Sequence, residues 1–128
     1  MTTIYELARL VYDDLGQGYS EAVYHSAFEV LLRERSVQYE TERIVPITFR
    51  GHVIGNVRCD IIINKQFIVE LKSITKLRPC DRLQLENYLR LTGIQAGYLA
   101  NFGPSLEVEE VSSPNTSQLP LENLLPNP

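Results

Sequence analysis

The sequence predicts an α/β protein in which helices flank a mixed central β-sheet. Two observations support this fold class. Helical and strand-like segments follow one another in the order helix–strand–strand–strand–helix–strand, after an additional N-terminal helix. The chain of 128 residues, with 44% apolar and 22% charged residues, is also long enough for one hydrophobic core and has the composition of an ordinary globular domain. We therefore expect one folded domain.

Two helices are expected in the N-terminal part of the chain. Apolar residues recur at helical spacing from Ile4 to Leu15, and Gly16 and Gly18 break this helix. Ser20 is a good N-cap, and the apolar pattern behind it continues to about Arg35. The sequence therefore predicts a helical pair before the first strand.

Three strands are expected to follow the helical pair. The first runs from Val37 to Phe49 and contains Pro46, which favours an edge position or a bulge. A turn at residues 50–52 leads into a strand from Val53 to Ile63, and a third strand covers residues 67–71.

The rest of the domain is predicted to hold one more helix and one or two strands. Pro79 suits a first helical turn, and the helix is expected to continue to about Thr92, where Gly93 ends it. A strand is expected at residues 95–101, with an edge strand at residues 106–111. We expect the domain to span residues 1–111, and residues 112–128, with four prolines, to form a poorly ordered tail.

Charged residues interrupt the second and third predicted strands. A carboxylate in an apolar strand is costly unless it is compensated. If residues 64–66 form a three-residue loop, Ile63 pairs with Phe67 and Asp60 lies opposite Glu70, with Lys72 on the same face as Glu70. A two-residue loop would instead put the two carboxylates on opposite faces.

A cation between the two carboxylates would explain this arrangement. Like charges that face each other destabilise a sheet, and a hard cation such as Mg²⁺ takes oxygen ligands of this kind. The alternative is that Asp60 and Glu70 are solvent-facing hairpin residues with Lys72 as a salt-bridge partner. The three residues alone leave both interpretations open.

Polar side chains on two helices are further candidates. Glu21 precedes Tyr24 and Phe28 by three and seven positions, which places it on the apolar stripe, although a first-turn glutamate also complements the helix dipole. Tyr24 would hydrogen-bond that carboxylate or pack in the core. Gln84 and Tyr88 lie one turn apart on the later helix, where Gln84 would orient a ligand or water, or lie at the surface.

The net charge of −4 argues against a protein that coats nucleic acid indiscriminately. The charge is uneven, however, because residues 58–82 contain six basic and three acidic residues. Such a basic surrounding suits a phosphate-bearing substrate, and a solvated loop with scattered charges is the alternative. Five residues are the candidate substrate contacts: Tyr24, Lys76, Arg78, Arg82 and Tyr88.

The remaining composition excludes several other classes of protein. Cys59 and Cys80 have a spacing that fits neither a disulfide framework nor a zinc site, so we expect free thiols in a reducing, cytoplasmic compartment. No signal peptide is expected, and no apolar run approaches a membrane span, so no membrane partner is expected. Serine-protease chemistry has no support, and His25 and His52 are expected to be structural or surface residues.

Several short motifs occur in order along the chain. Gly18, Glu21 and Tyr24 read G-x-x-E-x-x-Y, and Asp60 with the later Glu70-Leu71-Lys72 reads D…E-x-K. Residues 84–89, 92–93 and 101–103 follow as Q-L-E-N-Y-L, T-G and N-F-G. From residue 4 to residue 111 the chain resembles the GxxExxY family of the PD-(D/E)XK nuclease superfamily. The resemblance implies a restriction-endonuclease-like core and a metal-dependent nuclease, a hydrolase that acts on phosphodiester bonds in DNA.

The resemblance also implies a metal site. Asp60 and Glu70 would hold Mg²⁺ or Mn²⁺, the Leu71 carbonyl would be a further ligand, and Glu21 would ligate the metal directly or through water. In this chain Cys59 precedes Asp60, where these proteins more often carry a small or apolar residue, and no proline precedes Asp60.

The resemblance implies catalytic roles for two further residues. Lys72 would position the attacking water or stabilise the pentavalent phosphate, and Gln84 would assist at the site, giving a 5′-phosphate and a 3′-hydroxyl. A second interpretation is a non-catalytic nucleic-acid-binding or assembly protein that retains the fold. The acidic composition favours a homodimer or a protein partner that helps to hold the DNA.

Overall fold

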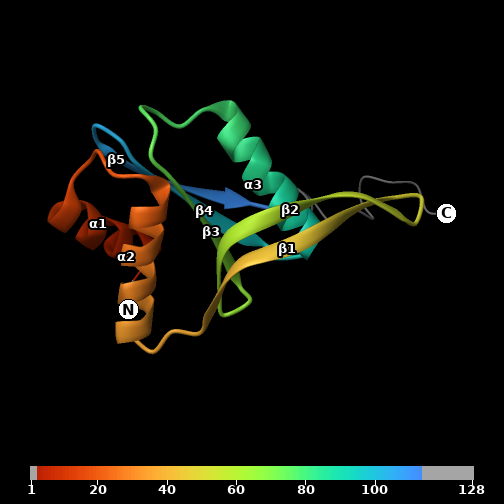
Figure 1. Ribbon diagram of the computed structural model, residues 1–128, viewed down its shortest axis with the longest axis horizontal. Coiled ribbons are helices and arrows are strands. Elements are labelled where there is room, and N and C mark those ends of the chain that lie inside the picture. Colours follow the sequence, from red (N-terminus) through yellow and green to blue (C-terminus); the bar gives the residue numbers. More distant parts are fainter. Residues whose placement is uncertain (1–2, 114–128) are drawn as a thin grey trace, which may run out of the picture.

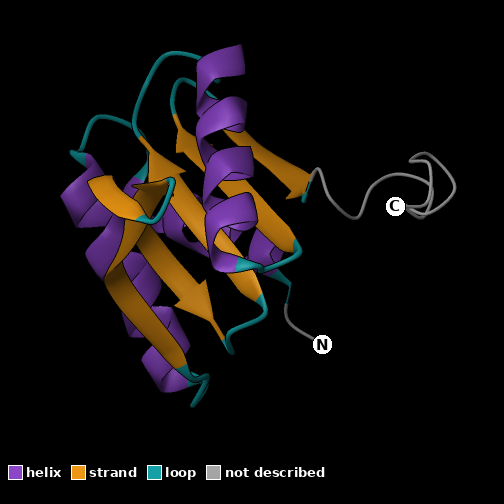
Figure 2. Ribbon diagram, turned by 90° about the vertical axis from the view of Figure 1, so that its right-hand side faces the viewer, coloured by secondary structure: helices purple, strands orange, loops and turns teal. Residues whose placement is uncertain are grey.

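The computed structural model describes residues 3–113, which form a five-stranded mixed sheet with helices on both faces (Figures 1 and 2). In these residues the elements are α1 (Ile4–Leu15), α2 (Glu21–Glu34), β1 (Tyr39–Phe49), β2 (His52–Ile63), β3 (Phe67–Lys72), α3 (Pro79–Thr92), β4 (Ala96–Phe102) and β5 (Leu106–Ser112). The predicted fold class is confirmed.

The strands lie in the order β1-β2-β3-β4-β5, so neighbours in the sequence are neighbours in the sheet. β3 and β4 are parallel and are joined through α3, whereas the other neighbouring strands are antiparallel. The parallel pair makes the sheet mixed, because a parallel connection needs a crossover and α3 supplies it.

Two apolar cores lie on the two faces of the sheet. The core beside α1 and α2 contains Leu7, Ala8, Val11, Tyr24, Phe28, Leu32, Ile61, Ile63, Val69, Leu71, Ala100 and Phe102. The core beside α3 contains Val45, Cys59, Ile62, Ile68, Leu77, Leu85, Tyr88, Leu89, Ile94, Leu99 and Val111. Both faces of β3 and β4 are therefore covered, which agrees with their nearly continuous apolar sequences.

The predicted helix bounds agree closely with the structure. α1 ends where Gly16 adopts a positive φ of 69°, and α3 ends at Gly93 with a φ of 78°. The first strand begins at Tyr39 instead of Val37, because the Val37 N–H donates to the Leu32 carbonyl and still belongs to the end of α2.

β1 is an edge strand, as Pro46 indicated, and its register shifts between Ile47 and Thr48. β1 and β2 form a long hairpin whose outer end projects away from the helices (Figure 1). The predicted edge strand at the other side of the sheet is β5, which ends at Ser112.

The loop between β2 and β3 has three residues. Ile63 pairs with Phe67, as the three-residue loop required, and Asn64 and Lys65 both have positive φ angles, of 51° and 56°. The Gln66 N–H closes the turn on the Ile63 carbonyl at 2.8 Å. This loop fixes the register that brings Asp60 and Glu70 to neighbouring positions.

Two further predictions concern the ends of the chain and membranes. The predicted tail from residue 112 overlaps β5 at Ser112, and residues 114–128 lie outside the described residues. Within residues 3–113, no helix has the length and apolar character needed to cross a membrane.

Candidate active site

The carboxylates of Asp60 and Glu70 meet where the β2–β3 ladder ends. The last ladder pair before them is Ile61 with Val69. Beyond it, the Asp60 N–H donates to Oε2 of Glu70 at 2.8 Å, and the Leu71 N–H donates to Oδ2 of Asp60 at 3.1 Å. Each carboxylate therefore replaces a ladder hydrogen bond by accepting from the main chain of the neighbouring strand.

The outer side of β2 is irregular at the same position. The β1–β2 ladder pairs Thr41 with Ile61 and Arg43 with Cys59, and Glu42, between these pairs, has a φ of 53°. Cys59 and Ile62 both pack beside α3 although they are three residues apart, so the alternation of faces is interrupted around Asp60. This interruption lets Asp60 line a hollow beside α2 while Glu70 stays buried.

Glu70 is a buried acid without a cationic partner. Its side chain is 3% exposed, and none of the ion pairs within residues 3–113 includes it. Burial, followed by the nearby charge of Asp60, raises the pKa of Glu70 to about 8. Burial also raises the pKa of Asp60, against the hydrogen bond from Leu71. The charge of Lys72 lowers both pKa values only in part, so an ionised pair at this position needs further positive charge.

Lys72 lies beside the two acids but pairs with an amide. Its Nζ donates to Oε1 of Gln84 at 3.0 Å, which joins the end of β3 to α3. Lys72 takes part in no ion pair among the described residues, so the alternative of a salt bridge to Asp60 or Glu70 is not observed. Gln84 thus holds the ammonium group without neutralising it.

Tyr88 lies one helical turn beyond Gln84 and is largely buried. Burial, and after it the charge of Glu70, raises the pKa of Tyr88 to about 12. Tyr88 and Gln84 also line a shallow hollow with Cys80 and Val57. These contacts place Tyr88 near Glu70 with one side toward an accessible surface.

Glu21 lies at the open side of the site. It is the first residue of α2 and is exposed, so the prediction that it points inward along the apolar stripe is wrong. Its charge still contributes to the raised pKa of Glu70, and it lines the hollow that contains Asp60. The stripe begins one turn later, at the buried Tyr24.

The hollow beside α2 is acidic. We call it the α2 hollow, and it is lined by Glu21, Ala22, His25, Ser26, Glu29, Thr41, Glu42 and Asp60. Among residues 3–113, no three His, Cys, Asp or Glu side chains converge on one point as a preformed metal cluster. Carboxylate oxygens such as those of Asp60 and Glu70 are the ligands that a hard cation such as Mg²⁺ prefers, and such a cation keeps waters on its other positions.

His25 is a site residue that the sequence analysis missed. Its Nδ1 lies 3.0 Å from Oε2 of Glu29, and its Nε2 lies 3.3 Å from the carbonyl oxygen of Asp60. His25 therefore connects α2 to the residue that carries the first carboxylate. The available signal was its spacing, because His25 follows Glu21 by four positions and lies on the same face of the helix.

Tyr24 is not accessible to a substrate. It is fully buried, its Oη donates to the Gly16 carbonyl at 2.6 Å and accepts from the Tyr19 N–H at 3.2 Å, and its ring stacks on Phe102 at 4.3 Å. The predicted substrate contact by Tyr24 is therefore replaced by a structural role. Tyr24 holds the loop between α1 and α2 against the core.

The basic residues after β3 are mostly engaged within the chain. Arg78 donates to both carboxylate oxygens of Asp81, at 2.9 and 3.1 Å, and Arg82 donates to Glu109 at 2.6 and 2.8 Å. Lys76 is exposed. Two of the three predicted phosphate contacts thus have acidic partners already.

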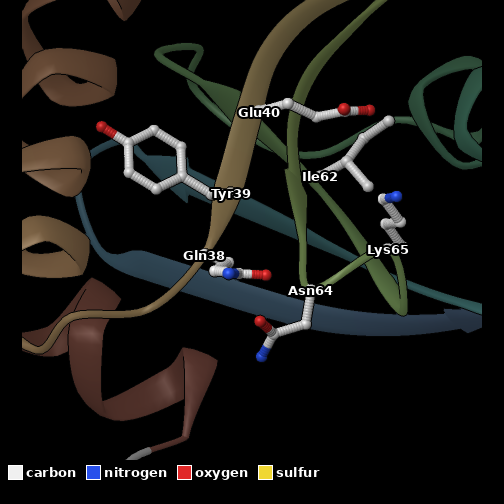
Figure 3. A pocket seen from close by; sticks show the side chains of 6 residues that line it. All are labelled: Gln38, Tyr39, Glu40, Ile62, Asn64 and Lys65. Carbon is white, nitrogen blue, oxygen red and sulfur yellow. The ribbon is translucent and has the colours of Figure 1, made fainter.

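A second hollow lies at the base of the β1–β2 hairpin and contains none of the predicted site residues. It is lined by Gln38, Tyr39, Glu40, Ile62, Asn64 and Lys65 (Figure 3). Tyr39 and Glu40 point to opposite sides of β1, as alternation requires (Figure 3). Lys65 is an exposed lysine in this hollow and is a suitable comparison for Lys72.

Comparisons with known proteins agree with this architecture. A family model described as the PD-(D/E)XK nuclease superfamily matches residues 1–112. The solved structure of SSO0001 is 28% identical with a TM-score of 0.59, over 73% of this chain and 50% of that chain, so the present chain spans about half the length of SSO0001. No curated protein matches the chain.

An alkaline exonuclease from Laribacter hongkongensis, LHK-Exo, has a similar fold. Its structure is 12% identical with a TM-score of 0.56, and the match covers 90% of this chain and 73% of that chain. At this identity the similarity supports the restriction-endonuclease-like fold, with its mixed sheet between helices.

Proposed function

The chain belongs to the PD-(D/E)XK nuclease superfamily, and on that premise we propose that it is a metal-dependent nuclease that hydrolyses phosphodiester bonds in DNA. The observation that carries the proposal is the contact between Asp60 and Glu70, each of which accepts a hydrogen bond from the strand of the other. Glu70 is buried and Asp60 is half-buried, both have raised pKa values, and neither has an ion-pair partner with Lys or Arg among residues 3–113, which supports a binding place for a cation.

The proposed cation is Mg²⁺ or Mn²⁺, held by Asp60, Glu70 and the Leu71 carbonyl. Glu21, at the mouth of the α2 hollow, would contribute through a water, which its exposed position supports. When bound, such a cation activates water and neutralises charge on the phosphate.

Lys72 supplies the fixed positive charge of the proposed site. Its ammonium group is oriented by Gln84 and has no acidic partner among the described residues, so it is available to a phosphate oxygen or to the attacking water. A positioned cationic group of this kind stabilises the charge that develops in the transition state. Gln84 acts by holding Lys72.

Four residues remain as proposed substrate contacts. Lys76 is exposed, whereas Tyr88 is buried and reaches DNA only through the hollow that it lines. Arg78 and Arg82 would have to exchange their carboxylate partners for phosphate groups, which makes them weaker contacts than their charge alone suggests.

We also assign the chain to the GxxExxY group of the superfamily. Gly18 has a φ of 108°, which favours glycine, Glu21 lines the α2 hollow, and Tyr24 closes the α1–α2 loop. Gly18 and Tyr24 thus support the loop before α2, at whose start Glu21 lies, and this division of roles supports the assignment. The free thiols of Cys59 and Cys80 support action in a reducing, cytoplasmic compartment.

Cleavage assays test the proposed function. Single-stranded, duplex and branched DNA would be incubated with the wild-type protein and Mg²⁺ or Mn²⁺, with Lys72→Ala as the site variant and Lys65→Ala as the matched control. We expect cleavage by the wild type and by Lys65→Ala, and a loss of about 10²-fold or more in Lys72→Ala.

Two outcomes would contradict the proposal. Equal cleavage by Lys72→Ala and the wild type would show that the activity does not arise at this site. DNA binding without cleavage of any of the three substrates would instead favour a non-catalytic binding or assembly protein.

A further inference from the structure

The outer part of the β1–β2 hairpin has an unusual surface. We call residues 43–58 the hairpin arm; it extends beyond the helices at the end of the molecule where β1 and β2 turn (Figure 1). Four large apolar side chains on the arm are more than half exposed: Ile44, Phe49, Val53 and Ile54. Exposed apolar side chains that gather in one place commonly mark an interaction site.

The charge of the arm is also one-sided. It contains Arg43, Arg50, Arg58 and His52 and no acidic residue, in a chain whose net charge is −4. Arg43 is paired with Glu40, but Arg50 and Arg58 belong to no ion pair among residues 3–113. Two arginines are therefore available to an anionic partner.

One face of the arm is not covered by any other element of residues 3–113, and it leads to the proposed active site. Val45 and Val57 pack on the α3 side, so their neighbours Ile44 and Arg58, which pair across the two strands, lie on the opposite face. Arg58 is two residues from Asp60 in β2. The six steps along the strand from position 54 to position 60 span about 20 Å, which equals the rise of roughly six nucleotides along one strand of a duplex.

The tip of the arm carries an aromatic platform. The Phe49 side chain is exposed, and the guanidinium of Arg50 lies 5.9 Å from the centre of its ring. Aromatic rings and arginine planes of this kind stack on unpaired bases, and the charge contacts the backbone. A nucleic acid complements both properties at once.

We infer that the hairpin arm is a nucleic-acid-binding surface that holds the substrate on one side of the cleavage site. This inference rests on the proposed function. It assigns substrate binding to a surface of this chain, without a partner protein. A second copy of the chain fits the arm less well. In a two-fold dimer the same patch meets itself, which would bring the two sets of arginines together.

Binding measurements with the full chain test the inference. Fluorescently labelled 30-nucleotide single-stranded and duplex DNA would be titrated in EDTA, at several salt concentrations, with the wild type, Arg50→Ala/Arg58→Ala and Phe49→Ala. Arg90→Ala, at an exposed arginine in α3, and Leu10→Ala, at an exposed leucine in α1, are the matched controls.

The two arm variants are expected to weaken DNA binding in different ways. Arg50→Ala/Arg58→Ala should weaken binding at least about tenfold and lower the slope of log K against log salt by about 1.8, because each phosphate contact contributes about 0.9. Phe49→Ala should weaken single-stranded binding about tenfold and duplex binding less, because stacking requires unpaired bases. The controls should bind like the wild type.

Three outcomes would overturn the inference. If the folded arm variants bind and cleave DNA as the wild type does, the arm is not the substrate-binding surface, although the nuclease proposal stands. If the wild type binds neither DNA, the inference and the DNA substrate fail together. If sedimentation shows a dimer that Phe49→Ala dissociates with DNA affinity unchanged, the arm is a self-association surface.

Discussion

Glu70 and Asp81 are two acids with the same burial and opposite surroundings. Each side chain is 3% exposed. Asp81 receives two hydrogen bonds from the Arg78 side chain and one from its N–H, and this partner holds the pKa of Asp81 below its usual range. Glu70 faces Asp60 and has a pKa raised to about 8. Burial alone therefore does not distinguish the two acids; the lack of an ion-pair partner among the described residues makes Glu70 the candidate for a functional role.

The two acids should differ most in catalysis. Glu70→Gln and Asp60→Asn are expected to lower cleavage by about 10³-fold, because they remove charge from the proposed cation site, whereas Asp81→Asn should change cleavage less than about threefold. Initial rates with Mg²⁺ would measure the difference. Comparable losses in all three variants would remove the distinction between the two acids.

The same variants should have opposite effects on stability. In EDTA at pH 8, Glu70→Gln should raise the free energy of unfolding by about 1–3 kcal/mol, because it removes an uncompensated buried charge. Asp81→Asn should lower it by about 1–2 kcal/mol, because Asp81 caps the start of α3. Urea unfolding measures both changes, and destabilisation by Glu70→Gln would contradict the comparison.

The pH dependence of stability should sharpen the contrast. Folding raises the pKa of Glu70 from its ordinary value of 4.5 to about 8. The contribution of the protonated Glu70 to the free energy of unfolding is therefore fully present below pH 4.5 and is lost as the pH rises through about 8. In EDTA the stability advantage of Glu70→Gln over the wild type should therefore grow between pH 5 and pH 9, by an amount on the order of a few kcal/mol.

Asp81 should show the opposite sign. Its pKa is lowered in the folded state, so its contribution is present at neutral pH and is lost only as the pH falls below its ordinary range. Unfolding curves of the wild type and the two variants at each pH would measure this. A constant difference between the wild type and Glu70→Gln from pH 5 to pH 9 would refute the assignment of the raised pKa to Glu70.

Cation binding should offset the destabilisation of the folded state by the ionised Glu70, and it should not depend on Asp81. At pH 8, a Mn²⁺ concentration about 100 times the dissociation constant should stabilise the wild type and Asp81→Asn by about 2.7 kcal/mol. Glu70→Gln should gain much less. Thermal unfolding with and without Mn²⁺ measures this, and equal stabilisation of all three proteins would place the cation elsewhere.

Among the variants expected to lose activity, His25→Ala should show the smallest loss, because His25 contacts the main chain of Asp60 and not its carboxylate. His25→Ala should lower cleavage about tenfold by loosening the position of Asp60, with the KM for DNA little changed. Ser26→Ala, at an exposed neighbour that also lines the α2 hollow, is the matched control. Equal rates for both variants would make His25 a purely structural residue.

The sequence was sufficient for the order of the elements and for the register of the site. A three-residue loop after Ile63 determines which residues of β2 and β3 meet, and that information is local. Likewise, glycine and proline mark the ends of α1 and α3 because their backbone preferences do not depend on distant contacts.

Contacts between distant segments could not be predicted in this way. Arg82 meets Glu109 only because β4 and β5 return beside α3, and Tyr24 is buried by Phe102 from β4. The interruption at Glu42 had no signal either, since a glutamate rarely adopts a positive φ. These residues needed the packed structure because their partners are far away in the sequence.

The short β2–β3 hairpin also has a consequence for how the molecule folds. Asp60 and Glu70 are ten residues apart, so their encounter needs only the formation of a small hairpin, which takes about 1–10 μs. Lys72 gains Gln84 only after the β3–α3–β4 crossover has formed. The two acids can therefore meet before Gln84 reaches Lys72, at a stage when a bound proton or divalent ion would relieve their repulsion.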